Sequence, residues 1–452
     1  MAQYGQVTNK RQKTARDLAR GAAEPSDFFP GLGRVEYRPE AGPDDTLCYR
    51  HYNPGERLHG RTMEDWLRPA VSFWHAFCHT GGDQHGQPTF HRCWDDGGSP
   101  LEVCKRRIRA AFELYSKLGV KFWTLTDLDV APEEESAEES RGGLDEVVPL
   151  VQELQQRAGV KPLWMAADLH RSPRYAGGAA TSSDAAVVAR AGAQLKRTLE
   201  AAHKLGAECV VFLNLREACP SLLGADVARE LRIYSRLLKM TADYKERLGY
   251  RGQLLLDCSG WGQEGLQGEK YRARHHYTGD AAKALCFLKH HNLERHYKLS
   301  VAAPRQFQIG WASAYGALGS VEATGPSFYG TMDEATYVMK TIIEQGGIQP
   351  GGLNIGVLLH RSSTDVKDLF EAYVSCIDKY ARGLRNAVKI VTDGLFTKNL
   401  QQQYASFHAG FGARVSNGEA TLEDCEEHAT KQRDEPASRR TEHWEAVFSR
   451  YV

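Results

Sequence analysis

From about residue 69 onward, short apolar runs alternate along the chain with stretches of helical periodicity. The runs are too apolar on both faces for a half-exposed antiparallel sheet, which indicates parallel strands covered by helices. Eight such units predict an α/β protein with a (β/α)₈ TIM barrel, and a doubly wound open sheet is the main alternative. The expected strands are 70–78, 121–126, 162–169, 209–215, 252–257, 297–302, 319–324 and 352–359.

Helical periodicity follows the apolar runs, and several of these segments stop at a glycine. Gly119 and Gly206 stand where a helix commonly ends in a left-handed residue. No G-x-G-x-x-G follows an early strand, so a dinucleotide-binding sheet has no support. The expected helices include 101–118, 185–205, 226–248 and 331–345.

The two ends of the chain lie outside this alternation. Residues 1–68 are polar and rich in glycine and proline, and are expected to form an N-terminal extension. Residues 395–452 are charged and show no strand pattern, which predicts a mainly helical C-terminal tail. Its thin apolar stripe suggests that the tail wraps another surface, such as a neighbouring subunit. The barrel is then expected over 69–394.

The composition excludes several kinds of partner. The chain carries 57 Lys and Arg against 57 Asp and Glu, so its formal net charge is zero. Balanced charge gives no general attraction to nucleic acid or to anionic lipid, and neither is expected to bind. No apolar run approaches the roughly 20 residues of a membrane span. Ten cysteines without a C-x-x-C pair, and no apolar leader, predict a cytoplasmic protein with free thiols.

The second expected strand runs directly into carboxylates. The stretch KFWTLTDLDVAPEE (121–134) places Asp127 and Asp129 just beyond an apolar run. In a barrel of this kind the active site lies at the C-terminal ends of the strands. A carboxylate at this position is therefore a candidate site residue, although a loop cap is the structural alternative.

Several motifs along the chain resemble those of the xylose isomerases. The likeness runs in consistent order from about residue 28 to 410. It implies a TIM barrel, usually a homotetramer, that interconverts an aldose and its ketose with two divalent cations such as Mg²⁺ or Mn²⁺. The matching segments are RHYNP (50–54), WHAFCHTGGDQHG (74–86), DLDVAPE (127–133), SPRYAGGAAT (172–181), GGLN (351–354) and RSSTD (361–365).

Two strand ends depart from the family's catalytic groups. The family has a histidine at position 126 that binds the sugar's ring oxygen, and Asp129 retains its aspartate partner. Thr126 stands in place of the histidine, and its hydroxyl is no acid or base near neutral pH. At the fifth strand Asp257 replaces a ligand glutamate, and Ser259 replaces the lysine that assists at the carbonyl.

Three further strands depart from the family's metal ligands. Ala302 replaces a bridging glutamate, and Arg305 replaces a histidine ligand and would repel a dication. Glu322 replaces an aspartate, and residues 354–358 (NIGVL) lack both an aspartate and a lysine. Asp257 and Glu322 are therefore the remaining, vestigial candidates for a metal site. We predict that Arg305 forms a salt bridge to one of them and closes the pocket.

Three residues are candidates for contact with a ligand. Trp164 lies in the third strand and is either a wall for a sugar ring or a plain core tryptophan. His79 stands where the family has an active-site aromatic residue. Arg305 makes an anionic ligand such as a sugar phosphate conceivable. A minor alternative is a transition-metal site built from His75, His79, His85 and His91.

Two functions remain open. The first is a pseudoenzyme that has lost two-metal isomerisation, needs no cofactor, and binds a sugar or anion or serves as a scaffold. The second is an active D-xylose/D-xylulose isomerase with a reduced site, and only this alternative would require Mg²⁺ or Mn²⁺. Both imply self-association as a homotetramer or homodimer. The residues that would carry the second are Asp129, Trp164, Asp257 and Glu322.

Overall fold

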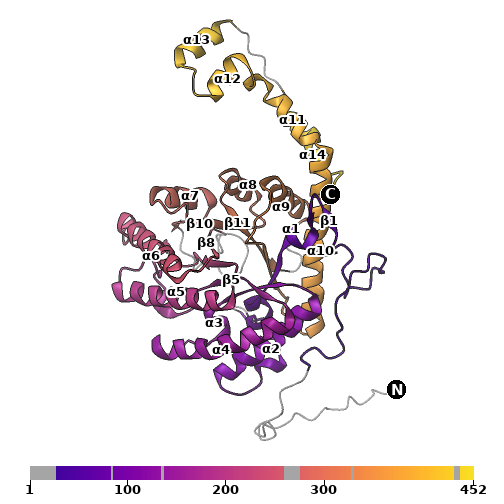
Figure 1. The fold of residues 1–452 in the computed structure, drawn as a ribbon, viewed down its shortest axis with the longest axis vertical. Coiled ribbons are helices and arrows are strands. Elements are labelled where there is room, and N and C mark those ends of the chain that lie inside the picture. The colour runs from indigo at the N-terminus through magenta and orange to yellow at the C-terminus, as the bar shows by residue number, and fades with distance from the viewer. Residues whose placement is uncertain (1–26, 83–84, 134–136, 259–274, 327–329, 432–437) are drawn as a thin grey trace, which may run out of the picture.

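Eight parallel strands close into one barrel in this computed structural model (Figure 1). It describes residues 27–82, 85–133, 137–258, 275–326, 330–431 and 438–452. The (β/α)₈ prediction is confirmed, and the open-sheet alternative is wrong. The strands are β3 (Pro69–Ser72), β4 (Phe122–Thr126), β5 (Lys161–Ala166), β6 (Cys209–Phe212), β8 (Gln253–Asp257), β10 (Tyr297–Ala302), β11 (Leu318–Pro326) and β12 (Leu353–Leu358).

Helices cover the outside of the barrel (Figure 1). Capping side chains and glycines set their limits: Ser99 accepts a bond from the backbone of Glu102, and Gly119 ends the same helix at φ 71°. The helices up to the tail are α1 (Met63–Leu67), α2 (Pro100–Leu118), α3 (Asp127–Val130), α4 (Ala137–Ala158), α5 (Ala185–Leu205), α6 (Val227–Leu248), α7 (Ala281–His290), α8 (Gln306–Ala314), α9 (Met332–Gln345) and α10 (Val366–Asp393).

Two short antiparallel pairs accompany the barrel. Strands β1 (Arg57–Leu58) and β2 (Arg61–Thr62) form one pair, and β7 (Ala218–Cys219) and β9 (His275–His276) form the other. Within the described ranges, no helix is long and apolar enough to cross a lipid bilayer.

The first barrel strand is much shorter than the apolar run that predicted it. Pairing with β4 ends at Ser72, and a π-helix follows over Trp74–Cys78. The amide of His79 donates to the carbonyl of Trp74 at 3.0 Å, which closes the wide turn. The prediction of a strand over 70–78 was wrong at its end, because apolar residues there serve a buried π-turn as well as they serve a strand.

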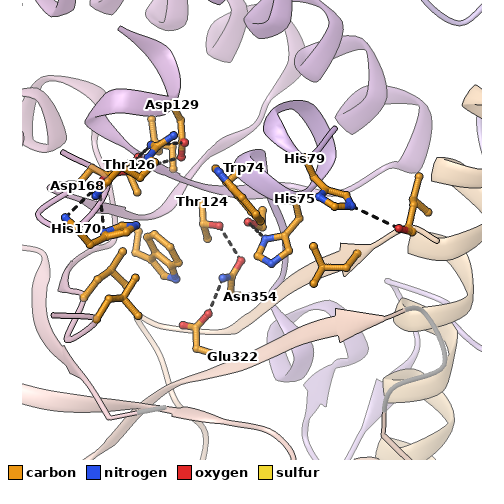
Figure 2. A pocket seen from close by; sticks show the side chains of 18 of the residues that line it. Trp74, His75, His79, Thr124, Thr126, Asp129, Asp168, His170, Glu322 and Asn354 are labelled. Atoms are coloured by element: carbon orange, nitrogen blue, oxygen red, sulfur yellow. Dashed lines mark hydrogen bonds and ion pairs between the residues drawn. The ribbon is translucent and has the colours of Figure 1, made fainter. Parts of the chain in front are cut away.

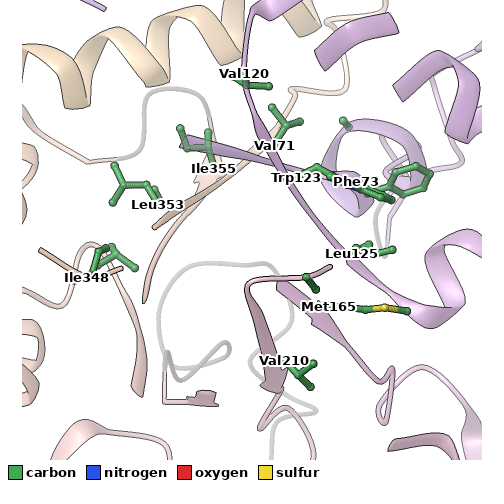
Figure 3. Packing of buried hydrophobic residues seen from close by; sticks show 14 of the residues in the cluster. Val71, Phe73, Val120, Trp123, Leu125, Met165, Val210, Ile348, Leu353 and Ile355 are labelled. Carbon is green, nitrogen blue, oxygen red and sulfur yellow. The ribbon is translucent and has the colours of Figure 1, made fainter. Parts of the chain in front are cut away.

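Side chains alternate along each strand between two buried layers. In β4, Trp123 and Leu125 point outward and join the large hydrophobic cluster under the helices (Figure 3). Phe122 belongs to a second cluster that fills the barrel interior. Thr124 and Thr126 share its face, so strand periodicity alone directs both hydroxyls inward.

Strand register then brings inward polar residues together. Ser300 of β10 lies opposite Asp257 of β8. Ala302 lies opposite Glu322 of β11, which in turn lies opposite Asn354 of β12. Residues far apart in the sequence therefore meet at one end of the barrel.

The predicted helical tail is present and extends away from the barrel (Figure 1). Its last helix lies back against the barrel, where Phe448 stacks on Tyr337 of α9 with ring centroids 4.3 Å apart. The tail helices are α11 (Leu395–Gln403), α12 (Gly410–Ser416), α13 (Leu422–Lys431) and α14 (Thr441–Phe448).

Candidate functional site

A cavity of about 700 Å³ lies at the C-terminal ends of the strands. Residues of β4, β5, β11 and β12 line it, together with the π-helix and the segment after β6. This is the end of the barrel at which the sequence predicted a site. Figure 2 shows two polar groups in the wall: Thr126, Asp129, Asp168 and His170 form one, and Thr124, Glu322 and Asn354 form the other.

Arg171 organises the first polar group. Its guanidinium lies 2.8 Å from Asp129 Oδ1 and also pairs with Asp168. The same group donates to Thr126 Oγ1 at 2.8 Å. Asp129 Oδ2 accepts the backbone N–H of Thr126 at 2.7 Å, as a capping box at the start of α3. An arginine, not a histidine, is therefore the partner of Asp129.

Burial controls the protonation of the groups around the cavity. It raises the pKa of Asp129, and the guanidinium of Arg171 opposes that rise. It lowers the pKa of His170 to about 4 and that of His75 to about 3. Both imidazoles are therefore neutral near pH 7 and add no positive charge to the cavity wall.

Glu322 is the centre of the second polar group. Its Oε1 accepts from Ser300 Oγ at 2.6 Å, and its Oε2 accepts from Asn354 Nδ2 at 2.6 Å. Asn354 Oδ1 accepts in turn from Thr124 Oγ1 at 2.7 Å. Burial raises the pKa of Glu322 to about 7, and the charge of Asp257 adds to the rise. One carboxylate thus ties four strands together.

A glycine in the eighth strand leaves room for an imidazole. A Cβ added at Gly356 would lie 2.5 Å from Nδ1 of His75. That nitrogen is bonded to Ser72 Oγ at 2.7 Å. The ring of His75 therefore fills the space that a side chain at position 356 would enter.

The donors around this network do not fit the two divalent cations that the resemblance implies. Hard cations take several oxygen ligands, mainly carboxylates and water. Both oxygens of Glu322 are engaged, and positions 302 and 356 carry no ligand atom. Among the described residues, no group of three or more His, Cys, Asp or Glu is placed to hold a metal ion.

The four candidate histidines do not gather into one site. His75 is buried and His79 is half-buried, whereas His85 and His91 are exposed. Since the part of the chain that the structure describes holds no metal-binding cluster, the transition-metal alternative was wrong.

Trp164 and His79 both line the cavity. Their contact with a ligand stays a prediction. Trp164 is 5% exposed, and its indole N–H lies near the Glu322 carboxylate and lowers the pKa of that group without completing a well-aligned hydrogen bond. His79 Nε2 lies 3.4 Å from the carbonyl of Leu359.

Arg305 is placed differently from the prediction. It is the N-cap residue of α8, and its guanidinium donates to the carbonyl of Gly279 at 3.3 Å. The ion pairs between described residues do not join it to Asp257 or Glu322, and it is absent from the described cavity lining. The predicted bridge was wrong, because the start of α8 directs this side chain toward the segment before α7. Ser259 lies outside the described residues.

Sequence reasoning missed three residues of the site, Asp168, His170 and Arg171. They follow β5 just as Asp127 and Asp129 follow β4, and the same rule about strand ends would have selected them. Asp168 is fully buried and also accepts the backbone N–H of Arg171 at 3.0 Å.

Comparison with known proteins covers nearly the whole chain. The family model of the XylA2 C-terminal domain matches residues 400–452. A xylose isomerase of Arabidopsis thaliana is 39% identical over 443 residues, 93% of this chain and 90% of that protein. Xylose isomerases of Hordeum vulgare and Enterococcus faecalis are 36% and 34% identical, over 89% and 90% of this chain and 86% and 95% of those proteins. With this extent of identity on a closed barrel, the chain belongs to the xylose isomerase family.

Proposed function

We propose that this family member does not perform two-metal aldose–ketose isomerisation and instead binds a small hydroxylated ligand in the barrel mouth. One observation carries the proposal: the carboxylates Asp129 and Glu322 are already engaged by neighbouring side chains. Glu322 accepts hydrogen bonds from Ser300 and Asn354, and Arg171 supplies the positive charge beside Asp129. A cation at either carboxylate would compete with these donors and with the charge of Arg171.

The catalytic groups support the same proposal. Thr126 is hydrogen-bonded to Arg171, and its hydroxyl does not act as an acid or base near neutral pH. Position 259 is a serine, so the positive charge that the family places beside the carbonyl is replaced by a hydroxyl. Loss of both groups removes the aid to ring opening and to charge development at the substrate oxygen.

Calorimetry on chelator-treated protein tests the proposal. Mg²⁺, Mn²⁺ and Co²⁺ are titrated in turn, and the same samples are assayed for conversion of D-xylose to D-xylulose. We expect no stoichiometric binding at millimolar metal and no turnover. Binding of two ions with turnover would overturn the proposal.

An active isomerase is the second candidate, and one feature favours it. Glu322 has a pKa of about 7 and lines the cavity, as a group that exchanges protons near neutral pH would. Turnover in the assay above that disappears in Glu322→Gln, while the variant remains folded, would establish this candidate. We expect instead that neither protein converts the sugar.

We also propose that the chain self-associates through its tail as a homotetramer or homodimer. The tail exposes large apolar side chains in and just after α11: Leu400, Tyr404 and Phe407 are each 44–51% exposed. Exposed apolar patches of this kind mark surfaces that another protein chain covers. Light scattering after size exclusion should give a multiple of 50.4 kDa. Leu400→Asp with Phe407→Asp should reduce that mass, and an unchanged mass would exclude the tail from the interface.

All ten cysteines are free in the structure. Unpaired thiols are usual in a reducing compartment. We therefore propose a cytoplasmic location, which fractionation of cells that express the tagged chain would test.

A further inference from the structure

The wall of the cavity is apolar between its two polar groups. Leu358 and Leu359 form one side at the end of β12, and Leu213 and Leu215 form another after β6. Trp74, on the π-helix, adds an indole that is 37% exposed. A free sugar carries hydroxyls on all of its edges and would leave several of them unpaired against this surface, which costs binding energy.

The volume of the cavity also favours a ligand larger than a free sugar. Cavities of roughly 300–1,000 Å³ hold ligands of drug-like size. The cavity here measures about 700 Å³. A pentose would occupy only part of it, and the remaining volume is bounded by leucines and by Trp74. The space therefore fits a ligand with an apolar ring attached to its hydroxylated part.

One position on the wall suits a hydroxyl group. The buried N–H of Trp164 lies close enough to the Glu322 carboxylate to lower the pKa of that group, but not in the geometry of a complete hydrogen bond. A hydroxyl beside both groups would accept from the indole and donate to a remaining lone pair of the carboxylate. An unpaired buried donor of this kind is costly unless a ligand or water completes it.

Charge disfavours an anionic ligand. Asp129, Asp168 and Glu322 all line the cavity. Arg171, the cation beside two of them, is already paired with both. Arg361, the other arginine of the described lining, donates to the carbonyl of Gln87 at 3.0 Å. A phosphate would therefore enter a wall with three carboxyl groups and two engaged arginines, and like charges at short range repel. Arg305, the earlier candidate for an anion, bonds to the carbonyl of Gly279 instead.

We infer that the cavity takes an uncharged glycoside with an aromatic aglycone. A sugar hydroxyl binds beside Trp164 and Glu322, and the aglycone packs on Leu358 and Trp74. This rests on the proposed ligand-binding function and narrows it to a class of ligand that is larger and less polar than a free aldose.

Binding is measured by calorimetry with phenyl β-D-xylopyranoside, D-xylose, D-xylose 1-phosphate and phenol as separate probes. The glycoside should bind at least tenfold more tightly than D-xylose or phenol, and the phosphate should bind most weakly. Equal or tighter binding of D-xylose, or of the phosphate, would overturn the inference while leaving the ligand-binding proposal intact. Binding of none of the four overturns the inference. Turnover of D-xylose would instead overturn the proposed function.

Three variants locate the bound glycoside. Leu358→Lys places a charge in the apolar wall and should weaken glycoside binding at least tenfold. Trp164→Phe retains a ring but removes the N–H donor, and should weaken it severalfold. Trp311→Phe is the matched control, because Trp311 lies on α8, is 38% exposed and is not part of the described cavity lining. Equal affinities in Trp164→Phe, Leu358→Lys and the control, all folded by circular dichroism, would place the ligand elsewhere and overturn the inference.

Discussion

Two buried carboxylate sites of this barrel are built in opposite ways. Glu217 accepts three backbone N–H groups, from Ala179, Ala180 and Thr181, at 2.9–3.1 Å. Asp129 in the cavity wall depends on the side chain of Arg171 for its charge balance. Both carboxylates are at most 2% exposed. Glu217 is therefore held mainly by main-chain donors, whereas Asp129 has one main-chain donor, Thr126, and depends for its charge balance on a long side chain that is itself partly exposed.

The difference separates the scaffold from the site. The clamp at Glu217 fixes the segment GGAAT, which is one of the motifs that this chain shares with the xylose isomerases. Gly178 within it has φ 93°, and an added Cβ would lie 2.3 Å from Thr181 Oγ1. Backbone donors packed this closely around a carboxylate accept few residue types in the 177–181 segment. The side chain that pairs with Asp129 can be exchanged more easily. This explains how the frame keeps its motifs while the cavity wall differs.

The largest loss of stability is expected when the hydrogen bonds of Glu217 to the backbone are removed. Glu217→Ala leaves three buried N–H groups without an acceptor, and should lower the free energy of unfolding by about 4 kcal/mol. Urea denaturation followed by fluorescence measures this. Glu334→Ala is the matched control, because its carboxylate also accepts a backbone N–H but is exposed. The control should lose no more than about 1 kcal/mol, and equal losses in both variants would contradict the comparison.

A smaller effect is expected from breaking the side-chain pairing. Arg171→Met leaves the carboxyls of Asp129 and Asp168 without their cation, and should lower the free energy of unfolding by about 2–3 kcal/mol. The loss is below that for a fully buried pair because the side chain of Arg171 is 35% exposed. Unpaired buried carboxyls bind protons more readily, so the cost should be smaller at pH 5 than at pH 8. Denaturation at the two pH values measures it.

Arg229→Met is the control for that variant, because Arg229 forms an exposed pair with Asp226. Arg229→Met should change the free energy of unfolding little at either pH. A cost for Arg171→Met that does not change with pH would mean that the guanidinium acts by packing alone.

The smallest effect is expected at Glu322, whose partners are neutral. Its pKa is raised from 4.5 to about 7, so its protonated form stabilises the fold below pH 4.5 and that contribution is lost as the pH rises through about 7. Relative to Glu322→Gln, the native protein should lose on the order of 2 kcal/mol of stability between pH 4.5 and pH 8. Parallel pH profiles of the two proteins would show that this carboxyl does not titrate in the range.

Much of the fold was predictable, and less of the site. Eight apolar runs predicted the barrel strands, and the glycines at 119 and 206 predicted helix ends at the correct residues. The rule about strand ends predicted a site at Asp129. It did not predict the pairing with Arg171, because that contact joins β4 to the loop after β5 and depends on which way a long side chain turns. Arg305 shows the same limit, since its helix position aims it away from the cavity.

The sequence by itself determined the barrel, its inward-facing polar positions and the family. These follow from local periodicity and from motifs, which need no knowledge of distant contacts. Only the tertiary structure decided that Glu322 accepts from Ser300 and Asn354, that His75 fills the space beside Gly356, and that leucines of two strand ends line the cavity beside its polar groups. Those outcomes depend on strand register and on packing between segments hundreds of residues apart in sequence, where small differences in side-chain direction change which groups meet.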